Sequence, residues 1–285
     1  MKILITGING YLGKLIASEL KLRGHSVIGL DRNHLQGFPD TLAKLIKNSH
    51  VVINLAGSNI LKRWTESAKS EIYTSRIRTT QNLVKAILLL ENKERPRLFI
   101  SASAIGIYKA GESHDESSTR FDPGFLGKVV KDWEAALVDL PAEIRTIIFR
   151  ISPVLGKHSK MIKKLKLPFL LGVGGRIASG KQAFSFIHEK DLVNAFTAAI
   201  EENWNGTFNL SAPEQINNLD FTRTFAKIVR RPAILPVPRF ALWILYGEAT
   251  STMVTSPWVI PKALLDHNFQ FQFPDIESAL NDILT

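Results

Sequence analysis

Three glycines near the N-terminus have the neighbours of a loop that binds phosphate groups. Gly7, Gly10 and Gly13 follow the apolar run at 2–6 and open a segment in which apolar residues have helical spacing. In such a loop the first glycine allows a tight turn, the second lets a diphosphate approach the backbone, and the third lets the helix pack against the sheet. The free amides and the positive end of the helix dipole then face the phosphates.

The loop is expected to bind a dinucleotide. Its glycine spacing is three and three, whereas the standard fingerprint has two and three, so the strand before it and the helix after it carry the prediction. The predicted contacts are Gly7, Asn9, Gly10, Tyr11, Leu12 and Gly13.

Two residues after the next strand bear on the choice between two cofactors, NAD and NADP. Asp31 stands about where an acid binds the adenosine ribose hydroxyls, which favours NAD. Arg32 follows directly and is suited to a 2′-phosphate, which favours NADP. The pair leaves NAD and NADP both open.

Strands and helices alternate in the segments that must position this loop. Short apolar runs that end at a glycine or a polar residue predict buried parallel strands, and longer runs with helical spacing predict helices between them. The expected strands are 2–6, 26–30, 51–55, 98–101 and 144–151, and the expected helices are 11–23, 39–47 and 65–90. This alternation predicts an α/β fold with a doubly wound parallel sheet of the Rossmann type.

The alternation stops after residue 151, where prolines and glycines cluster. We expect a dinucleotide-binding domain at 1–152 and a smaller, mainly substrate-binding lobe at 153–285, with elements near 184–212 returning to the first domain. The expected elements are an extended stretch at 184–187, a strand at 207–210, and helices at 191–201, 218–229, 240–245 and 276–284. Asp191 is expected to cap the helix that follows it.

Composition excludes several kinds of chemistry. The 285 residues contain no cysteine, which excludes disulfides, thiolate catalysis and iron–sulfur clusters. The histidines show no metal-ligand spacing, so no metal site is expected. The net charge of +10 is spread along the chain without an arginine-rich arm, so we expect a basic surface and no nucleic-acid partner. The apolar run at 240–246 is too short to span a membrane and is expected as a core helix, and the protein is expected in the cytoplasm.

The chain resembles the short-chain dehydrogenase/reductase superfamily, extended type. The resemblance is carried by the glycine loop, by Asn54-Leu55-Ala56-Gly57, and by Ser101-Ala102-Ser103-Ala104-Ile105-Gly106. Segments at 62–65, 132–136, 184–191, 209–213, 231–238, 247–248 and 273–275 extend it over the whole chain, which is similar to the atypical epimerase-family subgroup of nucleoside-diphosphate-sugar epimerases.

The resemblance implies NAD(P) bound across the carboxyl ends of the strands and a small substrate under the C-terminal lobe. It adds the expected cofactor contacts Leu55, Ala56, Gly57, Ser101, Ala102, Ser152 and Pro153. Lys62, Arg63 and Trp64 are candidates for the substrate site, with a surface cluster at a helix start as the alternative. His188 is either a general acid or a hydrogen-bonded residue where the lobes join.

The catalytic pair of the superfamily is missing. Its members use a serine or threonine, a tyrosine, and a lysine four residues after the tyrosine, which lowers the tyrosine pKa. None of the four tyrosines here has a lysine four residues later, and counting back from Glu134 puts Leu126 and Val130 at the two positions. Ser103, at the position of the superfamily serine, and Tyr108 are the predicted catalytic residues, although an unassisted tyrosine with a pKa near ~10 is a poor base.

Two functions follow from these features. The first is an NAD(P)-dependent oxidoreductase or epimerase that acts on a small molecule, such as a sugar nucleotide or a carbonyl compound, with an unusual proton relay. The second is a non-catalytic NAD(P)-binding regulatory protein. A homodimer is compatible with either function.

Overall fold

The computed structural model describes all 285 residues, apart from the side chain of Gln36. Six parallel strands form the central sheet in the spatial order β2-β1-β3-β4-β6-β9. Their bounds are Lys2–Thr6 (β1), Ser26–Leu30 (β2), Val51–Asn54 (β3), Leu98–Ala104 (β4), Arg145–Ile151 (β6) and Gly206–Leu210 (β9). Apolar runs such as Ile3-Leu4-Ile5 are buried on both faces, as parallel strands covered by helices require. The predicted α/β fold with a parallel sheet is confirmed.

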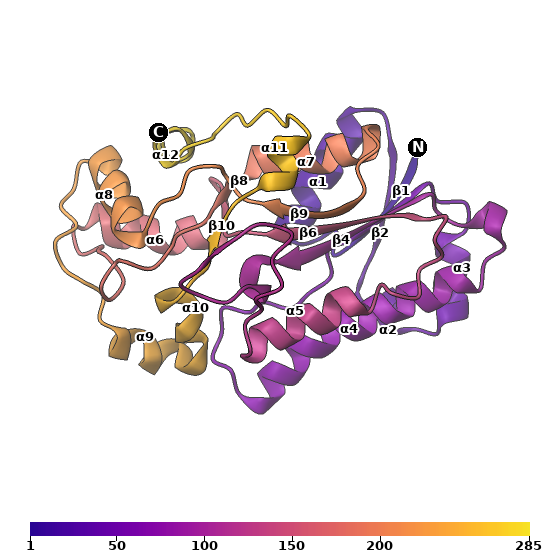
Figure 1. The fold of residues 1–285 in the computed structure, drawn as a ribbon, viewed down its shortest axis with the longest axis horizontal. Coiled ribbons are helices and arrows are strands. Elements are labelled where there is room, and N and C mark those ends of the chain that lie inside the picture. Colours follow the sequence, from indigo (N-terminus) through magenta and orange to yellow (C-terminus); the bar gives the residue numbers. More distant parts are fainter.

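Helices cover both faces of this sheet (Figure 1). The upper face in that view carries α1 (Tyr11–Leu22), α7 (Glu189–Glu201) and α11 (Lys262–Asp266). The lower face carries α2 (Arg32–Gln36), α3 (Pro39–Ile46), α4 (Glu66–Leu88) and α5 (Phe125–Ala135). Leu20 and Phe196 belong to one apolar cluster with the sheet, and Leu42 and Leu83 belong to another. The two clusters make the sheet a rigid base for whatever lies at its edge.

The strand order reverses at β1, because β2 lies on one side of it and β3 on the other. In open α/β sheets, ligands bind in the crevice outside the carboxyl ends of the strands at such a reversal. The register pairs Thr6 with Asn54, so the glycine loop and the turn after β3 leave the sheet side by side.

The C-terminal lobe has an apolar core of its own, which includes Phe169, Phe225 and Leu280. The core packs α6 (Lys160–Leu170), α8 (Asn218–Val229) and α12 (Ile276–Leu284), which lie together on the left in Figure 1. Two short parallel pairs complete the lobe: β7 (Val154–Leu155) with β8 (Ile187–His188), and β5 (Ser113–His114) with β10 (Trp258–Val259). The remaining elements are η1 (Asn92–Glu94), η2 (Ile105–Ile107), α9 (Arg239–Tyr246), η3 (Gly247–Thr250) and α10 (Ser251–Val254).

Several boundaries agree with the sequence and two expectations are wrong. The helices expected at 218–229 and 276–284 have those bounds. Of the extended stretch expected at 184–187, Ile187 belongs to β8, which pairs with β7. Asp191 is wrong as a cap, since the N-cap of α7 is His188. Asp191 instead accepts hydrogen bonds from the amides of Gln272 (2.7 Å) and Phe273 (3.0 Å), which ties the C-terminal segment to α7.

The expectation of a core helix at 240–245 is wrong as well. Only Leu242 of α9 is buried, whereas Phe240 and Leu245 have 68% and 66% of their surface exposed. Apolar character alone does not place a short helix in a core, since a helix of eight residues needs a neighbouring apolar surface to cover it.

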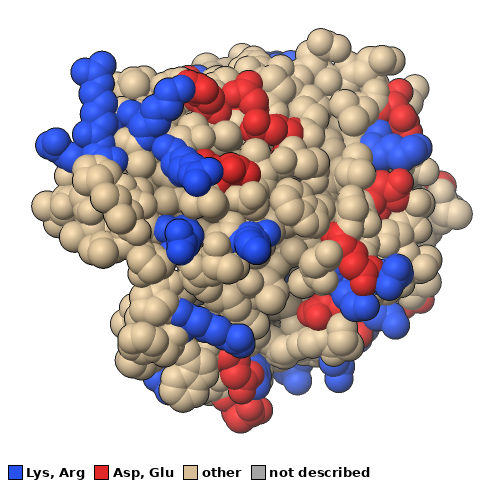
Figure 2. Space-filling view, turned by 60° about the vertical axis from the view of Figure 1, so that its left-hand side comes forward, with Lys and Arg blue, Asp and Glu red and all other residues tan. Residues whose placement is uncertain are grey.

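The surface of the molecule is unevenly charged. Lys and Arg side chains gather over one part of the face in Figure 2 and mix with Asp and Glu elsewhere. The lysines of the basic stretch on α6, among them Lys163 and Lys166, are exposed. Among the described helices, none combines the length and the apolar character needed to cross a bilayer.

Candidate functional site

The glycine loop has the close backbone packing that the sequence predicted. Gly7 has a φ of +70°, a conformation that favours glycine, and its carbonyl accepts a hydrogen bond of 2.9 Å from the amide of Gly10. A Cβ at Gly13 would lie 2.4 Å from the oxygen of Gly7 and 2.7 Å from the Cα of Ile8. Helix α1 starts after Gly10, which has no side chain to cap it, so the first amides of α1 are available to an anion.

A cavity of about 750 Å³ opens beside this loop. Its wall contains residues from the loop, from the end of β2, from the turn after β3 and from one side of α4, and includes Gly7, Asn9, Asp31, Arg32, Ala56, Gly57, Ser58, Glu71, Arg78 and Asn82. The structure thus brings together six of the predicted cofactor residues. It also adds residues of α4 that the sequence analysis missed. Their spacing in the sequence could have revealed them, because Glu71, Arg78 and Asn82 lie on one face of the helix.

Asp31 does not face the cavity as a free carboxylate. Its Oδ1 caps α2 by accepting a hydrogen bond of 3.1 Å from the amide of His34, and it lies 2.7 Å from the Nδ1 of that residue. The hydrogen bond from the His34 backbone lowers the pKa of Asp31. Arg32 has 67% of its side chain exposed and lies 3.5 Å from Glu71. At this edge of the cavity Arg32, which faces Glu71, and Arg78 contribute the guanidinium groups that can bind an anion.

The turn after β3 is fixed by a side chain of the first strand. Thr6 Oγ1 accepts hydrogen bonds from the amides of Leu55 (3.0 Å) and Ala56 (3.1 Å), and donates one of 2.8 Å to Asn54 Oδ1. The oxygen of Leu55 would lie 3.1 Å from a Cβ at Gly7, so the two loops touch.

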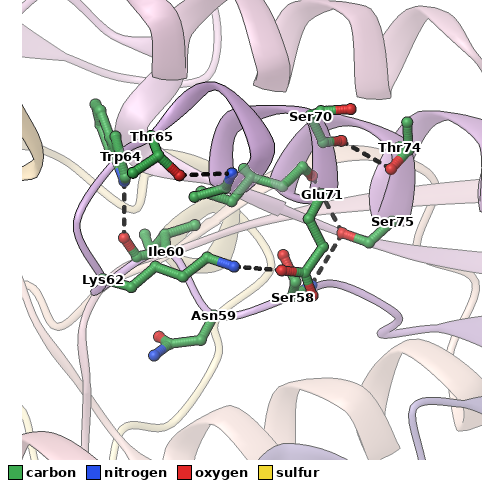
Figure 3. Close-up of polar contacts among 12 residues, drawn as sticks. Ser58, Asn59, Ile60, Lys62, Trp64, Thr65, Ser70, Glu71, Thr74 and Ser75 are labelled. Carbon is green, nitrogen blue, oxygen red and sulfur yellow. Dashed lines mark hydrogen bonds and ion pairs between the residues drawn. The ribbon is translucent and has the colours of Figure 1, made fainter.

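The loop at 58–65 continues from this turn along α4 (Figure 3). Lys62 pairs with Glu71, which lines the cavity, and the Trp64 indole donates to the oxygen of Ile60 at 2.9 Å. Trp64 is buried against Phe125, with ring centroids 5.1 Å apart. Of the three predicted substrate residues, Arg63 donates across the lobe junction to the oxygen of Ile244 at 3.1 Å, and Trp64 shares an apolar cluster with Ala249 of η3.

Ser103 belongs to a buried polar network. Its hydroxyl donates to Glu134 Oε1 at 2.6 Å, and Glu134 forms a bidentate pair with Arg150 at 2.9 and 2.8 Å. Arg150 also donates to the Tyr108 hydroxyl at 2.8 Å, and that hydroxyl donates to Asn209 Oδ1 at 2.8 Å. The network joins β4, α5, β6 and β9.

Tyr108 is enclosed by this network. It has 1% of its surface exposed, and burial raises the pKa of its phenol above the ordinary value. Its hydroxyl already has two partners, Arg150 and Asn209, which do not favour a catalytic role, and that role stays a prediction. Leu126 lies 3.8 Å from where a Cβ of Gly106 would stand, and Val130 is buried, so the missing catalytic pair is replaced by packing.

His188 is a buried residue where α7 meets α12. Its Nδ1 accepts a hydrogen bond of 3.2 Å from the Lys190 amide, and its Nε2 lies 3.3 Å from Asp282. The ring packs on Phe273 with centroids 3.8 Å apart. Burial lowers the pKa of His188 from 6.5 to about 4. A structural role at the lobe junction fits these contacts better than the general-acid alternative.

This histidine predicts a pH dependence of stability. The unfolded state takes up a proton at His188 below pH 6.5 and the native state does so only near pH 4, so unfolding is favoured as the pH falls through this range. We expect the wild type to lose about 3 kcal/mol of unfolding free energy more than His188→Asn does between pH 7 and 4. Asparagine keeps an N-cap acceptor without titrating. Urea unfolding at several pH values measures the difference, and parallel pH profiles of the two proteins would contradict it.

Comparison with known proteins places the chain in a family. The model of the NAD dependent epimerase/dehydratase family matches residues 3–211, and a domain of unknown function (DUF1731) matches residues 237–283. Epimerase family protein SDR39U1 of Mus musculus is 34% identical over 296 residues, which cover 100% of both chains. Epimerase family protein YfhF of Bacillus subtilis (strain 168) is 33% identical and covers 100% of this chain and 98% of its own.

Solved structures agree with the family match. The crystal structure of human epimerase family protein SDR39U1 with NADPH has a TM-score of 0.91 at 32% identity and covers 99% of each chain. UDP-glucuronic acid 4-epimerase from Bacillus cereus in complex with NAD, at 20% identity and a TM-score of 0.75, shares the fold. The chain thus belongs to the NAD dependent epimerase/dehydratase family, as its motifs predicted.

Proposed function

We propose that the protein is an NADP(H)-dependent oxidoreductase that exchanges a hydride between the nicotinamide and a small substrate held between the lobes. The observation that carries the cofactor choice is the state of Asp31, whose carboxylate caps α2 while Arg32 and Arg78 line the same cavity. A dianionic 2′-phosphate is favoured beside two guanidinium groups. The crystal structure of the human relative with NADPH supports the same choice.

The remaining cofactor contacts follow from the loops. The glycine loop and the start of α1 would hold the diphosphate, and Leu55, Ala56 and Gly57 would lie beside the ribose. Ser101, Ala102, Ser152 and Pro153, at the ends of β4 and β6, would lie toward the nicotinamide. When bound, the nicotinamide supplies or accepts a hydride.

Replacing the cavity arginines should change which cofactor binds. We expect Arg32→Gln and Arg78→Gln each to weaken NADPH binding about 10-fold, the low end for a charge-assisted hydrogen bond at an exposed site. NADH affinity should change less than about twofold, because the lost contact is to the 2′-phosphate. Fluorescence titration of both cofactors measures the ratio. Arg223→Gln, an exposed arginine on α8, is the matched control.

An equal loss of NADPH and NADH affinity in the two cavity variants would contradict the assignment of the arginines to the 2′-phosphate. Wild-type protein that binds neither cofactor at millimolar concentration would overturn the proposed function itself.

Ser103 is the chain's candidate for orienting a substrate oxygen. It stands near the carboxyl end of β4, and its hydroxyl proton is directed to Glu134, so the lone pairs of the oxygen remain as acceptors for a substrate hydroxyl. Hydride transfer is tested by following NADPH fluorescence after the holoprotein is mixed with each member of a panel of sugar nucleotides and carbonyl compounds. Oxidation of one equivalent of NADPH per protein by any compound supports the proposal.

A second candidate function is non-catalytic NADP(H) binding in a regulatory role. The observation that favours it is the replacement of the usual tyrosine and lysine by Leu126 and Val130, with no titratable group at either position. Cofactor binding without hydride transfer across the whole panel would select it. A homodimer and a cytoplasmic location stay predictions, which light scattering and cell fractionation would test.

A further inference from the structure

Arg76 is a partly buried cation without a counter-ion. It lies on α4, where Nη1 donates to the oxygen of Ile72 and Nη2 to the oxygen of Ser58, both at 3.1 Å. Among the side chains that the structure describes, none places a carboxylate oxygen within 4.0 Å of it. Arg150, which is buried, has the bidentate carboxylate of Glu134. A partly desolvated charge with only neutral partners is costly, and this cost predicts an anionic ligand.

The surroundings hold the guanidinium in place. Its central carbon lies 5.2 Å from the ring centroid of Trp133 on α5, a cation–π contact. A Cβ at Gly57 would lie only 3.0 Å from the same carbon, so the absence of a side chain there lets Arg76 reach the end of β3. Burial lowers the pKa of Arg76 to about 10, with no carboxylate to oppose it, and the group stays charged at neutral pH.

The position of Arg76 separates it from the adenosine side of the cavity. Gly57, Ser58 and Ser75 line the cavity, whereas Arg76 lies between α4 and α5 and is not among the described lining residues. Trp133 belongs to an apolar cluster with Trp64, Ala249 and Tyr246, and the last two come from η3 and α9 of the C-terminal lobe. Through Trp133, Arg76 borders an apolar cluster that reaches the C-terminal lobe, on the side where the substrate is proposed to bind.

We propose that Arg76 binds a carboxylate or phosphate group of the substrate, so that the protein selects small anionic substrates. Two of its five N–H groups are used by backbone oxygens, and the planar guanidinium leaves the others for the oxygens of an anion. The proposal rests on the proposed function, since it assigns the substrate class of the same site. The competing source of the anion is the cofactor diphosphate.

The test uses protein saturated with NADPH, so that the cofactor's own phosphate sites are filled. Inorganic phosphate and acetate are titrated while tryptophan fluorescence is recorded, because Trp133 contacts the guanidinium and should report an anion there. We expect saturable changes that Trp133→Phe removes. Arg76→Gln should weaken them at least 10-fold, and Arg76→Lys, which keeps the charge without the planar fork, should weaken them less. Arg223→Gln, the exposed arginine on α8, is the matched control and should leave the response intact.

Three outcomes overturn the assignment. An unchanged response in Arg76→Gln places the anion elsewhere. A 10-fold loss of NADPH affinity in Arg76→Gln, with no anion response in the wild-type holoprotein, assigns the guanidinium to the cofactor diphosphate. No response in folded wild-type and Arg76→Lys holoprotein shows that the charge has no anionic ligand. Failure of the wild type to bind NADPH would instead contradict the proposed function. This result differs from the three above, which contradict only the anion site at Arg76.

Discussion

Glu134→Ala is expected to lower the free energy of unfolding by about 3–5 kcal/mol, the cost of removing one partner of a buried ion pair. The side chains of Arg150 and Glu134 have 8% and 14% of their surface exposed. Alanine would leave the Arg150 guanidinium with the Tyr108 hydroxyl as its remaining side-chain partner and would remove the acceptor of the Ser103 hydroxyl. Urea unfolding followed by circular dichroism at pH 7 measures the loss.

The matched control for this loss removes both charges together. In Glu134→Gln/Arg150→Met the uncompensated cation is gone, so stability should recover to within about 2 kcal/mol of the wild type. The cycle made of Glu134→Gln, Arg150→Met and this double variant then gives the coupling between the two side chains. A loss below about 1 kcal/mol in Glu134→Ala would show that water compensates Arg150 and that the network does not hold β4, α5 and β6 together.

The parts of the molecule that the sequence predicted well depend on neighbours in the chain. The glycine loop could be recognised because the strand, Gly7, Gly10, Gly13 and the helix are contiguous, so the local signals were complete. The fold followed for the same reason, since buried parallel strands are continuous apolar runs. Asp31 and Arg32 leave the cofactor choice open in the sequence, and the amide that Asp31 caps, that of His34, lies only three residues away.

The parts that the sequence did not reveal depend on contacts between distant segments. Tyr108 looked available because it follows a strand end, but Arg150 and Asn209, 42 and 101 residues further on, enclose its hydroxyl. The sequence around Arg76 does not indicate a binding role, because the neighbours of its guanidinium are Gly57 and Trp133 of another helix. Helix α9 reads as apolar and lies exposed, because burial depends on which surface covers a helix.

Gly10→Ala and Gly13→Ala should both weaken NADPH binding at least ~100-fold, which is about 2.7 kcal/mol, for different physical reasons. A methyl group at Gly13 would meet the Gly7 oxygen at 2.4 Å and the Ile8 Cα at 2.7 Å, both backbone atoms, so the loop must open and stability falls as well. At Gly10 the nearest atom to a new Cβ is the Gly7 oxygen at 3.1 Å, so the fold should tolerate the methyl group.

The contrast between the two glycines separates packing from ligand contact. Gly10→Ala should unfold within about 1 kcal/mol of the wild type and still lose NADPH, because its methyl group would occupy the space through which the diphosphate approaches the backbone. Gly106→Ala, whose Cβ would stand 3.8 Å from Leu126, should keep both properties. Titration calorimetry and urea unfolding measure the two quantities. If Gly10→Ala binds NADPH with wild-type affinity, the diphosphate does not lie against this loop, and the cofactor site must be placed elsewhere at the sheet edge.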